Sequence, residues 1–320
     1  MSVEFNEQQK KAVEHKSGPL LIIAGAGTGK TAVVTGRILY LLKKKLAKPS
    51  EILALTFMEK AANEMIERID IEMPLGYEEI SISTFHSFCD RILRQEGFFL
   101  GMDPNYKLMT EAESYAFFKR NIFKFPLETL RPLNAPAKFV GEILNFYSRL
   151  QDEDVGFEEF SKYVKSKKNV LEKEEYVEMK ELADTYKVWT ELKEKEARMS
   201  FGDLIANTLK LFREKPHILK KYRERFKYVL VDEYQDTNYA QNVLVNTLML
   251  GENYEKATLQ ERKKANITVV GDDDQAIYKF RGAAISNILQ FKEVYPDLKR
   301  VVLTQNYRSN QEILDCAYGL

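Results

Sequence analysis

Short apolar runs of strand length alternate with helical patterns in the first and last hundred residues of the chain. Six such runs lie at residues 20–23, 52–57, 80–85, 228–232, 267–271 and 301–303. The segments after the first three repeat their apolar residues every three to four positions, as one face of a helix does. This alternation predicts a parallel, doubly wound α/β sheet with helices on both faces.

The strand pattern stops between about Leu108 and Met199. That stretch is rich in charged and aromatic residues, and residues 165–176 and 186–198 read as helices. Prolines break its first half into short pieces. We expect an all-helical subdomain, residues 109–198, inserted into the α/β lobe.

Length, charge and cysteine content exclude several classes of protein. The 320 residues are long for one compact domain and indicate two or three lobes. Lysine plus arginine equals aspartate plus glutamate at 48 each, so a nucleic-acid site would have to be a local patch. Two cysteines and three histidines argue against a disulfide framework and a zinc cluster. We expect neither a signal peptide nor a membrane span, and hence a cytoplasmic protein.

A glycine-rich loop follows the first apolar run and opens a helix. It consists of Ala24, Gly25, Ala26, Gly27, Thr28, Gly29, Lys30 and Thr31. This is the spacing of a phosphate-binding loop, in which backbone N–H groups cradle phosphate oxygens at a helix N-terminus. Lys30 would reach the β and γ phosphates of ATP, and the Thr31 hydroxyl would ligate Mg²⁺. The alternative is a glycine-rich turn that closes a strand–helix corner.

An acidic pair follows the run at residues 228–232. Asp232 and Glu233 would lie at the same edge of a parallel sheet as the phosphate loop. Asp232 would hold Mg²⁺, and Glu233 would polarise the attacking water. Without the phosphate loop, such a dipeptide is more often a solvated turn.

Together these motifs resemble superfamily 1 DNA helicases of the UvrD, Rep and PcrA type, over nearly the whole chain. Further segments similar to that family lie at residues 5–9, 55–62, 84–89, 200–204, 271–282 and 305–309. The sequence departs from the family pattern at three positions: Phe5, Gly202 and Phe280. Ala24 stands where the general phosphate-loop pattern has its first glycine.

The resemblance implies a domain organisation. Residues 1–108 and 199–295 would form a RecA-like ATP-binding lobe around the helical insertion. Residues 296–320 would begin a second motor lobe, whose remaining carboxy-terminal part is missing here. We therefore expect the amino-terminal part of a helicase, with weak nucleotide binding and slow turnover on its own.

The resemblance also assigns roles to single residues. Gln9 would contact adenine, Tyr307 would stack near it, and Arg308 would act as an arginine finger. Gln275 would sense the γ-phosphate. The expected catalytic residues are thus Lys30, Asp232, Glu233, Gln275 and Arg308.

A single-stranded DNA site is also implied. Aromatic rings suit sequence-independent binding, because every base has a π face. The expected DNA-contacting residues are Phe57, Phe201, Phe280, Tyr278, Arg281, Thr56, Thr84 and His86. Without the family pattern, a phenylalanine at a strand end is usually core, and His86 could equally be a buried histidine.

The function implied is that of an ATP- and Mg²⁺-dependent 3′→5′ DNA helicase or translocase. Its partners would be single-stranded DNA and 3′-tailed duplex DNA, with no membrane. Two alternatives stay open from the sequence: the motor part of a RecB- or AddA-type helicase–nuclease, and a nucleotide-gated single-stranded DNA-binding module without motor activity.

Overall fold

The computed structural model describes residues 4–74, 76–272 and 286–318. The chain divides into two compact units, residues 1–88 with 216–320 and residues 89–215. None of the described helices combines the length and the apolar character that crossing a bilayer requires.

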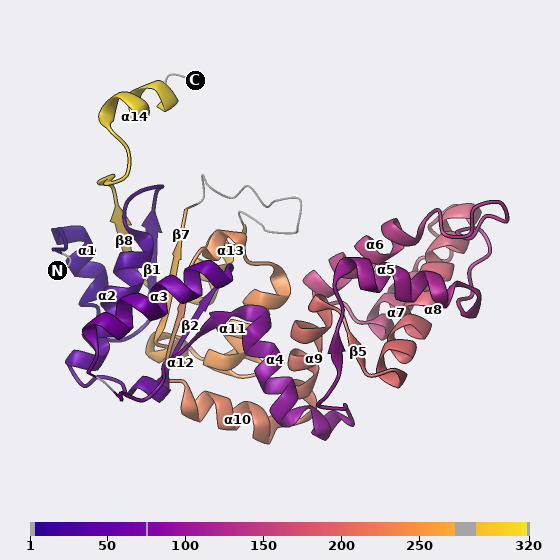
Figure 1. Ribbon diagram of the computed structural model, residues 1–320, viewed down its shortest axis with the longest axis horizontal. Helices are drawn as coiled ribbons and strands as arrows, with labels where there is room; N and C mark the ends of the chain where they lie inside the picture. The colour runs from indigo at the N-terminus through magenta and orange to yellow at the C-terminus, as the bar shows by residue number, and fades with distance from the viewer. Residues whose placement is uncertain (1–3, 75, 273–285, 319–320) are drawn as a thin grey trace. The chain divides into compact units, whose positions relative to one another are not determined.

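A six-stranded parallel sheet forms the centre of the first unit (Figure 1), in the order β3-β2-β6-β7-β1-β8. Its strands are β1 (Leu20–Ala24), β2 (Ile52–Thr56), β3 (Ser81–Thr84), β6 (Tyr228–Val231), β7 (Ile267–Gly271) and β8 (Lys299–Leu303). All six strands predicted from the apolar runs are confirmed, with ends that differ by at most two residues.

The sheet is buried on both faces. Leu20, Ile22 and Leu230 belong to a core cluster with apolar residues of the first three helices. Alternate strand residues such as Leu21 and Val229 point the other way and are equally buried. The predicted α/β fold class is thus confirmed. The helices of this unit are α1 (Glu7–Val13), α2 (Lys30–Lys43), α3 (Glu59–Glu72), α10 (Pro216–Arg225), α11 (Tyr239–Leu250), α12 (Leu259–Lys264), α13 (Ser286–Val294) and α14 (Gln311–Tyr318).

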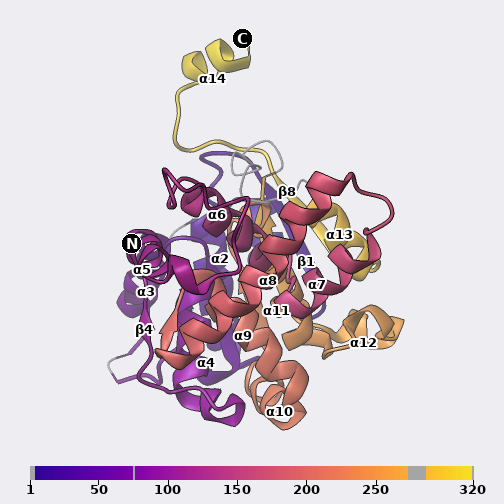
Figure 2. The same ribbon diagram turned by 90° about the vertical axis from the view of Figure 1, so that its right-hand side faces the viewer.

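The second unit is mainly helical (Figure 2). Phenylalanines, tyrosines and Trp189 form its core. The chain enters the insertion through β4 (Lys107–Leu108) and leaves it through β5 (Arg198–Met199), which pair in parallel. The main helices are α5 (Glu111–Arg120), α6 (Val140–Asp152), α7 (Phe157–Ser166), α8 (Lys173–Lys195) and α9 (Phe201–Glu214), and α4 (Phe85–Glu96) joins the two units along the chain.

Two details of the helical region differ from the sequence prediction. The helix predicted at residues 165–176 is wrong, because α7 ends at Ser166 and α8 begins at Lys173. A turn closes between them, with the N–H of Leu171 bonded to the carbonyl of Lys167. A capping box between Glu172 and Glu175 then starts α8. The predicted helix at 186–198 is only the end of α8, which stops at Lys195.

The strand β8 lies within residues 296–320, the segment that we assigned to a second lobe. It pairs with β1 from Leu20 opposite Lys299 to Ala24 opposite Leu303. These hydrogen bonds make β8 the edge strand of the first sheet, so residues 305–309 follow directly from a strand beside the phosphate loop.

Candidate nucleotide site

The carboxyl ends of the parallel strands bring the predicted nucleotide residues to one edge of the sheet. The phosphate loop follows β1, and the acidic pair Asp232–Glu233 follows β6, two strands away. Ligands bind at this edge in open parallel sheets because the strand-to-helix loops and the helix N-termini gather there.

The loop after β1 adopts the backbone that phosphate binding requires. Gly27 and Gly29 have φ of 75° and 84°, in the left-handed region that favours glycine. Gly29 directly precedes α2, whose first residue is Lys30. The Thr28 hydroxyl donates to the carbonyl of Gly25 at 2.7 Å and braces the loop internally. Ala24, at the position of the motif's first glycine, is fully buried as the last residue of β1.

Lys30 and Glu233 join the two motifs directly. The Lys30 ammonium lies 2.8 Å from Glu233 Oε2, and the two side chains are 10% and 34% exposed. Glu233 itself has φ of 50°, a strained conformation for a residue with a Cβ. The backbone at the end of β6 therefore turns sharply where it presents Glu233 toward the phosphate loop.

Two carboxyl groups near this pair have raised pKa values. Burial, and next the charge of Glu233, raises the pKa of Asp232 to about 7. The same two causes raise the pKa of Asp236 to about 6, and its Oδ1 is buried without a hydrogen-bond partner. A nearby cation would relieve both groups, because it would stabilise their charged forms.

The residues present fit an Mg²⁺ ion that would take most of its ligands from phosphates and water. Thr31, which is half-buried on the first turn of α2, and Asp232 supply the oxygen donors that Mg²⁺ prefers. Over the described ranges, no cluster of three or more acidic, histidine or cysteine side chains could hold a metal by itself. Mg²⁺ commonly binds through one or two protein groups together with phosphates and water.

Gln235 is a site residue that the sequence analysis did not single out. Its Nε2 donates to Glu233 Oε2 at 2.7 Å, and its Oε1 accepts the N–H of Asp272 at 3.1 Å. A Cβ on Gly271 would lie 2.8 Å from that Oε1, so Gly271 leaves room for the amide. Gln235 thus connects the carboxylate after β6 with the end of β7. Its place between Glu233 and Asp236 in the acidic motif was the available signal.

The expected adenine-reading segment packs against the phosphate loop. Gln9 is buried, and its Nε2 donates to the carbonyl of Thr28 at 3.0 Å. A capping box with Asn6 at the start of α1 orients Gln9. The ring of Phe5, where the family pattern has leucine, lies where a Cβ on Gly36 would be 2.4 Å away. The larger ring is therefore accommodated by a glycine in α2.

Residues after β8 also contact the phosphate loop. The Tyr307 N–H donates to the carbonyl of Gly27 at 2.8 Å, and the Asn306 amide donates to the carbonyl of Ala26 at 2.8 Å. Asn306 was not anticipated; its Oδ1 also accepts the N–H of Arg308 at 2.8 Å. A Cβ on Gly27 would lie 2.7 Å from the Cβ of Arg308. The backbone of Arg308 is therefore held beside the loop, and its side chain is exposed.

The expected DNA-contacting residues occupy varied environments. In the first unit, Thr56 and Thr84 are buried, whereas Phe57 and His86 are half-buried. The Thr84 hydroxyl donates to Glu59 at 2.9 Å, and burial lowers the pKa of His86. In the second unit, the Phe201 side chain is 46% exposed at the start of α9. The remaining predicted site residues, Gln275, Tyr278, Phe280 and Arg281, lie outside the described residues.

The chain is similar to known proteins over nearly its whole length. The model of the UvrD/REP helicase N-terminal domain family matches residues 5–296. The chain is 39% identical over 314 residues to the ATP-dependent DNA helicase PcrA of Bacillus subtilis (strain 168). It is 38% identical over 313 residues to the protein of that name from Staphylococcus epidermidis and 37% to that from Staphylococcus aureus. Each match covers 98% of this chain but 39% of the relative, so the chain spans about two fifths of these proteins. The chain belongs to the UvrD/REP helicase N-terminal domain family.

Proposed function

We propose that this chain is the ATP-binding part of a DNA helicase that hydrolyses ATP with Mg²⁺ and moves 3′→5′ along single-stranded DNA. The observation that carries the proposal is the 2.8 Å contact between Lys30 and Glu233. It joins the loop suited to hold phosphates with the carboxylate suited to activate water. The expected partners of this chain are single-stranded DNA and 3′-tailed duplex DNA. The relatives are named ATP-dependent DNA helicases, which supports DNA as the partner.

The contact between Lys30 and Glu233 suggests how hydrolysis is controlled. A triphosphate in the loop competes for the Lys30 ammonium, because phosphate oxygens carry more negative charge than one carboxylate. Glu233 then loses its cationic partner, and its freed oxygen can orient and polarise a water. Gln235 keeps Glu233 tethered at 2.7 Å during this exchange.

Other residues would bind and orient the nucleotide. Thr31 and Asp232 would hold Mg²⁺, which neutralises phosphate charge when bound. Gln9 and Tyr307 would contact the adenine, and Arg308 starts from a backbone fixed beside Gly27. Lys30 and the N-terminus of α2 would complement the charge of the phosphates.

The test compares two substitutions in the full-length gene product. Glu233→Gln keeps the shape of the side chain and removes its charge. We expect ATP binding to be retained while DNA-stimulated phosphate release falls by about 10²- to 10⁴-fold. Lys30→Ala should abolish phosphate release and also weaken ATP binding. Glu67→Gln, an exposed carboxylate on α3, is the matched control.

Unchanged phosphate release in Glu233→Gln would remove Glu233 from the mechanism. If the natural full-length protein released no phosphate with or without single-stranded DNA, but bound DNA in an ATP-dependent way, the chain would instead be a nucleotide-gated DNA-binding module.

A further inference from the structure

Asp203, in the second unit, is a buried carboxylate with an unusually full set of donors. The Lys193 ammonium lies 2.6 Å from both of its oxygens. The Gln151 amide donates to Oδ1 at 2.6 Å. The Ser200 N–H and hydroxyl donate to Oδ2 at 2.7 and 2.8 Å. We refer to Gln151, Lys193 and Asp203 as the carboxylate cluster.

The carboxylate cluster connects three helices, and it lies next to an exposed aromatic ring. Gln151 is on α6, Lys193 on α8 and Asp203 on α9. Asp203 is the third residue of α9 and forms a capping box with Ser200. Phe201 is the first residue of α9 and is 46% exposed. The cluster therefore fixes the backbone immediately beside that ring.

Gly202 shows how closely α6 approaches this turn. A Cβ at residue 202 would lie 2.2 Å from Gln151 Oε1 and 2.9 Å from Gln151 Cδ. The Gln151 amide thus occupies the space of a side chain at residue 202. This accounts for glycine at the position where the family pattern has an acidic residue. Both neighbours of Phe201 are consequently held, Ser200 by Asp203 and Gly202 by its contact with Gln151.

The buried charges have a better explanation as a positioning device than as a source of stability. Lys193 and Asp203 have side chains that are 3% and 11% exposed. Desolvation offsets most of the attraction in such a pair, and the best-attested role of buried ion pairs is to fix register. A ring held in advance also loses less conformational entropy when it binds a ligand.

We propose that the carboxylate cluster positions Phe201 for stacking on a base of single-stranded DNA. The inference deepens the proposed function and rests on it. Gln151, Lys193 and Asp203 are positioning residues, because they act through the backbone of residues 200–202 and touch no base themselves.

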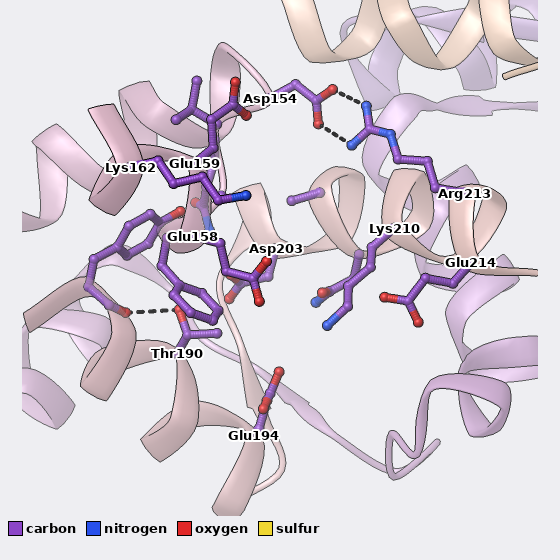
Figure 3. Close-up of a pocket in the computed structure, with 17 residues that line it drawn as sticks. Asp154, Glu158, Glu159, Lys162, Thr190, Glu194, Asp203, Lys210, Arg213 and Glu214 are labelled. Carbon is purple, nitrogen blue, oxygen red and sulfur yellow. Dashed lines mark hydrogen bonds and ion pairs between the residues drawn. The ribbon is translucent and has the colours of Figure 1, made fainter. Parts of the chain in front are cut away.

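Two residues of the carboxylate cluster line a cavity (Figure 3). Gln151 and Asp203 lie in the lining of a cavity of about 650 Å³ within this unit, where Asp154 pairs with Arg213. Truncation of Gln151 therefore enlarges an existing space instead of opening a new one in a packed core. Gln151→Ala also leaves the contact between Lys193 and Asp203 intact, so it is the milder variant.

The experiment measures the binding of the full chain to oligothymidylate that contains one 2-aminopurine. Stacking of an aromatic ring on the probe changes its fluorescence, and the same titration gives the dissociation constant. Gln151→Ala and Lys193→Met are made in the natural background and in the Phe201→Ala background. Lys187→Met, an exposed lysine on the same helix, is the control.

We expect Phe201→Ala to weaken binding at least about fivefold, since one stacked base contributes about 1–3 kcal/mol. Gln151→Ala and Lys193→Met should weaken binding and reduce the fluorescence change in the same direction. In the Phe201→Ala background they should add less than about twofold, because they act through the same ring. Lys187→Met should change neither readout.

Two results would overturn the inference. One is that Phe201→Ala weakens binding while Gln151→Ala and Lys193→Met leave affinity and fluorescence unchanged. The other is that the cluster variants have the same effect with and without Phe201, as a purely structural role predicts. If Lys193→Met does not fold, Gln151→Ala decides. If Phe201→Ala has no effect, the DNA contact that the family resemblance implies for Phe201 fails first, and this inference fails with it.

Discussion

Two buried aspartates, one in each unit, differ in how fully the chain satisfies them. Asp203 accepts hydrogen bonds from Lys193, Gln151 and Ser200, and its charge is balanced inside the helical unit. Asp232 at the end of β6 accepts, within the described ranges, one hydrogen bond, from the N–H of Glu233 at 3.0 Å. Burial raises the pKa of Asp232 to about 7.

The difference separates a carboxylate whose hydrogen-bonding capacity is met inside the chain from one whose capacity is largely unmet. Buried polar groups are normally satisfied, so an under-satisfied buried carboxylate beside the glycine-rich loop supports the proposed Mg²⁺ site. A fully satisfied carboxylate has no coordination left to offer and can only organise its neighbours. Burial alone would have placed Asp203 and Asp232 in the same class.

The largest expected effect is on the free energy of unfolding and concerns Asp203. Lys193→Met should lower the free energy of unfolding by about 3–5 kcal/mol, because it leaves Asp203 charged and buried without a cation. The double variant Lys193→Met with Asp203→Leu should recover most of that loss. Urea denaturation followed by circular dichroism measures both. A loss below about 1 kcal/mol in the single variant would show that Asp203 is not held as a buried charge.

The second expected effect is the pH dependence that Asp232 gives to the free energy of unfolding. The folded pKa of Asp232, about 7, is above its unfolded value, so its contribution to stability is fully present below about pH 4 and is lost as pH rises to about 7. The loss is at most about 4 kcal/mol, at 1.36 kcal/mol per pKa unit. Asp232→Asn should lack this slope, so the stability of the natural protein relative to Asp232→Asn should fall from pH 4 to about pH 7. Urea denaturation without nucleotide from pH 4 to 8 measures both proteins.

Magnesium nucleotide should oppose that pH effect. The charged carboxylate is stabilised by the cation, so saturating Mg²⁺–ATP analogue should protect the natural protein more at pH 8 than at pH 5.5. Equal protection at both pH values would argue that Asp232 does not face the metal.

The smallest expected effect compares the aromatic residues of the two units. Phe57→Ala should weaken binding of single-stranded DNA by about 1–3 kcal/mol, with little dependence on base identity. With Phe201→Ala the two losses should add within about 0.5 kcal/mol if the rings stack on separate bases. Fluorescence anisotropy with thymidine and adenosine oligomers measures this. No change for Phe57→Ala would assign its half-buried ring to the core.

The strands and the phosphate loop could be predicted because their signals are local. Runs of three to six mostly apolar residues, such as 52–57, suit a strand buried on both faces. Helix ends were harder, and the error at residues 165–176 shows why. Its charged residues continue a helical composition, whereas the turn after Ser166 depends on hydrogen bonds to Lys167 and on capping by Glu172. Those signals are weak in the sequence. The position of the turn depends on which apolar faces of the helices pack together.

The site was predicted as a set of residues but not as a set of contacts. Lys30, Asp232 and Glu233 follow from motifs that each lie within a few residues of sequence. The roles of Gln235 and Asn306 depend on partners that only the sheet brings near. Asn306 holds the carbonyl of Ala26, which is 280 residues away along the chain.

The sequence by itself determined that a parallel α/β lobe would carry a glycine-rich loop and an acidic pair at one edge. Hydrophobic periodicity and the backbone requirements of a loop act over a few residues, so both can be recognised from the sequence. Only the tertiary structure decided that Lys30 meets Glu233 and that β8 pairs with β1 at the edge of the sheet. It also decided that Asp203 forms an ion pair with Lys193, whereas burial raises the pKa of Asp232. These outcomes depend on the desolvation and pairing of charges from distant segments, which no local pattern encodes.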